Sequence, residues 1–189
     1  MAHKIIRDRL EAEKMAEDMF VRGDAPFVRI DYADIRTVRR MCVLKYAVCV
    51  EGSFSDALIE ELVQGYEELN IPNVDLRAVV VHIRTNADDS SVNTENATKL
   101  LWRVRDFKSE YSSNYNFEFL YGLTHHPSIE VGKWIVNLVI GVDKSEQDKA
   151  EDEFYEQKIE EYHNEMLSAN SAELSVSLDN DELQVMRVE

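Results

Sequence analysis

Apolar and polar residues follow one another in blocks that predict alternating strands and helices. Met41 to Glu51 is almost entirely apolar, as is typical of a central strand buried on both faces. Between the apolar blocks, hydrophobic positions recur at helical spacing. The predicted strands are 41–51, 76–85, 116–124 and 133–142, and the predicted helices between them are 55–69 and 94–111.

The two ends of the chain differ from this core. Residues 4–20 are rich in helix-forming residues and predict a leading helix. A short strand is expected at 27–31, and residues 33–40 fit no single element but are locally basic. Residues 145–168 predict a highly charged helix, after which the chain becomes rich in serine, aspartate and asparagine.

We therefore expect an α/β or α+β fold with a mixed sheet of about four or five strands and packed helices. Residues 1–143 form the core domain in this interpretation, 144–168 an acidic amphipathic helix, and 169–189 an acidic tail that is an edge strand or disordered. The last two core strands are close enough in sequence to pair antiparallel.

Composition indicates a reduced protein without membrane spans. No apolar run approaches the roughly 20 residues that a membrane helix needs, and the first eight residues contain charges too early for a secretory signal. Cys42 and Cys49 lie in one apolar run, where a strand would separate them by about 23 Å, so we expect two buried free thiols. These features predict a cytoplasmic protein.

The net charge of −16 is concentrated near the C-terminus, because residues 143–189 hold 15 acids and 4 bases. A nucleic-acid-binding protein normally has the opposite sign. A locally basic helix face could still contact nucleic acid, with Trp102 stacking on a base, although the acidic whole argues against direct binding. Its basic members are Lys99, Arg103, Arg105 and Lys108.

No motif identifies a reaction. The chain has only 6 glycines and lacks phosphate-binding and dinucleotide-binding loops, so we assign no catalytic residue, metal site or cofactor, and an enzyme is the less favoured reading. The best enzyme-like group lies where parallel strands should end and could hold Mg²⁺. Its members, which also suit helix caps and turns, are Glu51, Ser53, Asp56, Asp88 and Asp89.

The final helix carries a narrow apolar stripe with an acidic surround. The stripe has spacings of 4, 3 and 4, which suits docking on the chain's own core as well as on another subunit or a basic partner. We expect partner binding through the stripe residues Tyr155, Ile159, Tyr162 and Met166 and the acidic residues Glu153, Glu156 and Glu160.

The element order of residues 4–142 resembles small phage tail-completion or tail-terminator proteins, which are non-enzymatic ring-forming subunits. The resemblance concerns layout only. The strand and helix at 76–111 are an addition to a minimal version of that fold, and no residue role carries over.

These observations favour a non-catalytic assembly or adaptor protein, which is a homo-oligomer or a complex subunit with a basic protein partner. The resemblance implies a phage-type structural ring or tail-completion subunit, and a location in the virion if the chain is phage-derived. One alternative is an acidic inhibitor that mimics nucleic acid and occupies a basic groove on its target. A further alternative is a Mg-dependent enzyme that uses the carboxylates at the sheet edge.

Overall fold

The computed structural model describes residues 2–21, 25–28, 30, 32–72, 75–109 and 117–185. The elements, in chain order, are β1 (Lys4–Ile6), α1 (Arg9–Val21), β2 (Ala25–Val28), α2 (Tyr32–Met41), β3 (Val43–Gly52), α3 (Asp56–Glu68), β4 (Leu76–Thr85), α4 (Thr94–Ser109), β5 (Glu118–His125), β6 (Trp134–Val142) and α5 (Glu146–Val185).

The strands form one mixed sheet in the order β1-β3-β6-β4-β5-β2, which confirms the predicted α/β class. Among the described strands, only β4 and β5 pair parallel; β6 lies between β3 and β4 and is antiparallel to both. The expected pairing of β5 with β6 is therefore wrong. Strand β6 is apolar along nearly its whole length, so it suits the centre of the sheet better than a position beside an edge.

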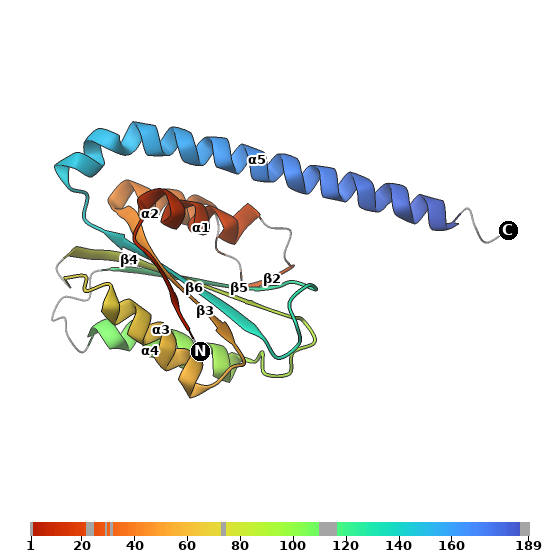
Figure 1. The fold of residues 1–189 in the computed structure, drawn as a ribbon, viewed down its shortest axis with the longest axis horizontal. Coiled ribbons are helices and arrows are strands. Elements are labelled where there is room, and N and C mark those ends of the chain that lie inside the picture. Colours follow the sequence, from red (N-terminus) through yellow and green to blue (C-terminus); the bar gives the residue numbers. More distant parts are fainter. Residues whose placement is uncertain are drawn as a thin grey trace.

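Two helical layers cover the sheet (Figure 1). Helices α3 and α4 bury their apolar sides on one face, where Trp134 is fully enclosed. Helix α1 packs on the other face through Ala12 and Ala16, whose four-residue spacing puts both on one side of the helix. Helix α2 adds Ile35 and Val38 to this second core.

Helix α5 lies on the same side as α1 and α2 and continues beyond the sheet (Figure 1). The helix was expected to end near residue 168, but it extends to Val185. The stretch 169–185, expected as an edge strand or a disordered tail, is thus helical here, and residues 186–189 lie outside the described part. No described helix is both long and apolar enough to cross a membrane.

The predicted leading helix is shorter than expected, because residues 4–6 form the edge strand β1 against β3. The ambiguous stretch at 33–40 belongs to α2. The remaining predicted helices are found within a few residues of their expected bounds, although residues 110 and 111 of the second one are outside the described ranges.

His3, just before β1, links the β1 edge of the sheet to α3. Its Nδ1 lies 2.7 Å from a Glu61 oxygen and its Nε2 3.2 Å from a Glu68 oxygen. The hydrogen bonds to Glu61 and Glu68 raise the pKa of His3 above its ordinary 6.5. Since protonated His3 is favoured in the folded chain, this contribution to stability is complete below about pH 6.5 and disappears as the pH rises through the raised value.

Wild type should lose stability between about pH 6 and pH 9 as His3 deprotonates. In His3→Gln this difference in the free energy of unfolding should be smaller, because the variant has no imidazole to deprotonate. Urea unfolding at both pH values measures this difference. Lys4→Gln, at the adjacent exposed position, is the control and should keep the wild-type difference. Equal pH dependence in wild type and His3→Gln would contradict the assignment.

The two cysteines are free, as expected: Cys42 is buried and Cys49 is half-buried. Burial raises the pKa of the Cys42 thiol to about 12, and burial also raises the pKa of Cys49. Because the thiolate is the reactive form, both positions should be slow nucleophiles near neutral pH.

A thiol reagent should label Cys49 slowly in the native protein and Cys42 more slowly still, since Cys42 is the less accessible. Mass spectrometry of each cysteine-containing peptide over time measures the two rates. Both should react at the same fast rate in denaturant, and fast native labelling of Cys42 would contradict the buried position.

Candidate functional site

Helix α5 begins with a hydrogen-bonded cap. The Ser145 hydroxyl accepts from the Asp148 backbone N–H at 3.1 Å, and an Asp148 oxygen accepts from the Ser145 backbone N–H at 3.0 Å. This reciprocal pair satisfies backbone donors that the helix start would leave open. The same carboxylate lies 3.2 Å from the Lys45 ammonium on β3. Burial acts to raise the pKa of Asp148, but the bonds from Ser145 and Lys45 outweigh it and lower the pKa.

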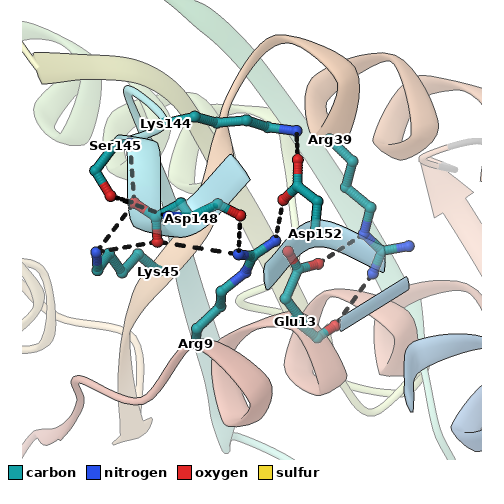
Figure 2. Close-up of polar contacts among 8 residues, drawn as sticks. All are labelled: Arg9, Glu13, Arg39, Lys45, Lys144, Ser145, Asp148 and Asp152. Carbon is teal, nitrogen blue, oxygen red and sulfur yellow. Dashed lines mark hydrogen bonds and ion pairs between the residues drawn. The ribbon is translucent and has the colours of Figure 1, made fainter. Parts of the chain in front are cut away.

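Arg9 joins the start of α1 to the first turns of α5 (Figure 2). Its guanidinium donates to Asp152 at 2.6 Å and to the backbone carbonyl of Asp148 at 3.2 Å. The same group lies over the Tyr155 ring, 4.1 Å from its centroid. Asp152 also pairs with Lys144 at 2.7 Å. Arg9 is buried, so this attachment is shielded from solvent.

Arg39 joins α2 to α1 through two buried acids. Its guanidinium donates to Glu13 at 2.6 Å and also to Glu17, whose side chain is fully buried. Burial acts to lower the pKa of Arg39, but the two glutamates outweigh it and raise the pKa. Two carboxylates share this guanidinium, and burial raises the pKa of Glu13. Arg39, Glu13 and Glu17 thus form a buried ion cluster between α1 and α2.

The same acids reach α5. His163 lies 2.9 Å from the second oxygen of Glu17, and the Tyr162 hydroxyl donates to Asp18 at 2.6 Å. Lys14 lies 5.0 Å from the Tyr162 ring centroid, and Ile159 is buried. The middle of α5 is thus docked on α1 of its own chain.

This docking bears on the residues expected to bind a partner. Tyr155, Ile159 and Tyr162 face α1, and Met166 is half-buried on the same side of the helix. The acids around the stripe are all exposed: Glu153, Glu156 and Glu160. Partner binding by these seven residues stays a prediction.

A groove of about 370 Å³ opens between α5 and α2, with residues of α1 also lining it. On the α2 side every lining residue is an arginine: Arg36, Arg39 and Arg40. The α5 side contributes carboxylates, including Glu156 and Glu160. The volume lies within the range of ligand pockets. The two sides of the groove carry opposite charges, although the chain as a whole is acidic.

Two of the carboxylates at the strand ends, Glu51 and Asp89, have structural partners. Glu51 pairs with Lys133 at 2.9 Å, and Asp89 accepts from the Ser91 hydroxyl at 2.7 Å. The cap of α3 is Ser55, which accepts from the Leu58 N–H. Among described residues, no group of three or more His, Cys, Asp or Glu side chains is arranged to hold a metal ion.

The basic face of α4 is largely neutralised by α3. Lys99 pairs with Asp56 at 2.5 Å, and Arg103 pairs with Glu60 at 3.1 Å. Arg105 lies over Trp102, 5.3 Å from the ring centroid, and Trp102 is about half exposed. The Lys108 side chain is outside the described part of the structure.

Comparison with known proteins finds no matching family model and no matching curated protein. Three solved structures illustrate a distant likeness. An FtsZ dimer from M. jannaschii is 21% identical over 61% of this chain and 32% of the FtsZ chain, with a TM-score of 0.44. GDP-form protofilaments of TubZ from Bacillus thuringiensis serovar israelensis are 9% identical over 88% and 42%, with a TM-score of 0.41. CetZ from Methanosaeta thermophila is 13% identical over 82% and 43%, with a TM-score of 0.35.

The chain therefore spans less than half the length of each of these three proteins, and the likeness concerns the arrangement of strands and helices. It contradicts the expected function of a non-catalytic adaptor or tail-completion subunit, because the similar structures are FtsZ, TubZ and CetZ. That function and its two alternatives are not proposed for this chain. The resemblance in element order to tail-completion proteins stays a prediction.

Sequence reasoning missed the buried part of the site. Glu13 and Glu17 stand four residues apart on α1, and Arg39 lies in a stretch recognised only as locally basic. An i, i+4 pair of glutamates beside buried alanines is a signal for a carboxylate pair facing the core. Nothing in the sequence identifies Arg39 as its partner.

Arg39→Ala should lower the free energy of unfolding by about 3–5 kcal/mol, because it leaves Glu13 and Glu17 buried without their cation. Arg40→Ala removes the same kind of side chain from the adjacent exposed position and should change stability by no more than about 0.5 kcal/mol. Urea unfolding of both variants measures the contrast. Equal effects would show that the cluster does not stabilise the fold.

Proposed function

We propose that this chain is a homo-oligomer-forming subunit that assembles through α5. The observation that supports the proposal is the course of this helix: its first half is fastened to α1 and β3, and its second half extends past the sheet (Figure 1). A segment held rigidly at one end and directed away from the core is suited to reach another molecule.

The size of the projecting part supports this role. Helix α5 has 40 residues, which corresponds to a length of about 60 Å. The attachments described above end near His163, so the last 20 or so residues extend some 30 Å further. An isolated helical segment of this length is marginally stable in water. Contact with a partner would stabilise it.

The charge of the projecting part defines the surface it would bind. Residues 164–185 contain five acids and no lysine or arginine. In the docked half, by contrast, Arg9 and Lys144 neutralise Asp152. A basic surface would relieve repulsion among the distal acids and speed encounter. Exposed Glu153, Glu156 and Glu160 would strengthen the acidic field around the same helix.

Removal of residues 170–189 should abolish self-association while leaving the core folded, since every described anchor of α5 lies before residue 170. Sedimentation velocity over a range of protein concentrations measures association of the full chain and of the truncated chain. The association should weaken as salt rises, because exposed charges are screened within about 8 Å at physiological ionic strength.

Glu146→Gln is the matched control, because it removes an exposed acid of α5 within the docked half. It should associate like the wild type. A full chain that is monomeric at every concentration would overturn the proposal, and so would a truncated chain that associates as strongly as the full one.

A further inference from the structure

The groove between α2 and α5 has walls of opposite charge that do not pair with each other. Arg40 lines it from α2, Glu156 and Glu160 line it from α5, and all three are exposed. Within the described part of the chain, none of these three side chains forms an ion pair or a hydrogen bond. Arg36 and Arg39, which also line the α2 side, already interact with other groups. The charges available to an occupant are therefore those of Arg40 and the two glutamates.

The two walls are held in place by attachments to α1. Arg39 fixes α2 through Glu13 and Glu17, and Arg9 fixes α5 through Asp152. The walls cannot close on each other without breaking these ion pairs, so the opposite charges stay apart. A preformed gap of this kind favours an occupant that meets both charges, because little further ordering of the protein is needed on binding.

The α5 wall also offers less polar surface between its charged groups. Tyr155 is half-buried and Ile159 is buried, and both line the groove. The two positions are one turn apart on the helix, so they lie on the same side of it. An aromatic ring and an aliphatic side chain at the same wall suit contact with a short apolar segment.

One of the groove-lining residues has a donor without an acceptor. Arg9 is buried, and its Nε has no hydrogen-bond partner among the described residues, although both terminal nitrogens of the same guanidinium donate to α5. Buried donors are seldom left unsatisfied in proteins, so this residue favours an occupant that brings hydrogen-bond acceptors. A carboxylate brings two acceptor oxygens together with the negative charge that complements Arg40.

We propose that the groove between α2 and α5 binds a small zwitterion, a molecule with a carboxylate at one end and an ammonium group at the other. The carboxylate pairs with Arg40, and the ammonium group pairs with Glu156 and Glu160. The segment between them lies against Tyr155 and Ile159. The groove volume of about 370 Å³ is at the small end of the range of ligand pockets, which suits a molecule of amino-acid or dipeptide size. This site does not depend on self-assembly through α5.

Probes of graded length test the site. The zwitterions ω-aminobutanoate, ω-aminohexanoate and ω-aminooctanoate carry the same two charges at increasing separation, whereas hexanoate and hexylamine carry one charge each. Isothermal titration calorimetry with the full chain measures the dissociation constant of each probe. One of the three zwitterions should bind at least about tenfold more tightly than either singly charged probe, because each end adds a hydrogen bond between charged groups. The proposal is overturned if none of the three does so.

Substitutions in the two walls assign the two ends of the ligand. Arg40→Gln should weaken binding of the best zwitterion about tenfold but leave hexylamine binding no weaker, because only the carboxylate contact is lost. The double variant Glu156→Gln with Glu160→Gln should weaken the same zwitterion by a similar factor but leave hexanoate binding no weaker. A variant that weakens both kinds of probe equally would contradict the assignment of that wall.

The matched controls are Arg105→Gln on α4 and Glu153→Gln on α5. Both residues are exposed, and neither lines the groove. Each control removes the same kind of charge as its groove counterpart and should bind the zwitterion like the wild type. An equal loss of affinity in a control and its groove counterpart would reveal a general effect of net charge and overturn the site. Wild-type affinity in both groove variants would overturn it as well.

Discussion

The ion cluster of Arg39 with Glu13 and Glu17 determines how α1, α2 and α5 assemble on one face of the sheet. Arg39 ties α2 to α1, and the second oxygen of Glu17 holds His163 of α5. Three helices that are distant in sequence thus meet at two adjacent carboxylates. A buried ion cluster contributes modest net stability, but it tolerates few geometries because each charge needs its partner. The direction of α5 follows from that constraint.

The core elements could be predicted because each buries a recognisable pattern. Strands β3 and β4 read as apolar runs, and α3 and α4 show helical spacing. Their neighbours in the sheet could not be predicted from these patterns. Insertion of β6 between β3 and β4 depends on long-range pairing, which leaves no local signal. Strand β1 has only three residues, Lys4–Ile6, and the helix-forming residues that follow it obscure its period.

The apolar stripe of α5 was recognisable from its spacing, but the surface on which the stripe packs was not. Tyr155 and Tyr162 are amphipathic, so their rings can pack beneath Arg9 and Lys14 while the Tyr162 hydroxyl bonds to Asp18. The same stripe could equally have docked on another protein. The deciding residues are cations and acids of α1, whose spacing does not reveal which later helix they contact.

Attachment through charged pairs also explains why α5 can project without losing its orientation. An arm on a flexible linker would lose conformational freedom whenever it bound, and this cost would weaken each contact. Here Arg9, Asp148 and Glu17 hold the first half of the helix before any partner arrives. The helical backbone transmits that orientation to the distal half. Because the anchors are buried, salt should screen them less than it screens exposed charges, and the anchored half should stay in place as the salt concentration rises.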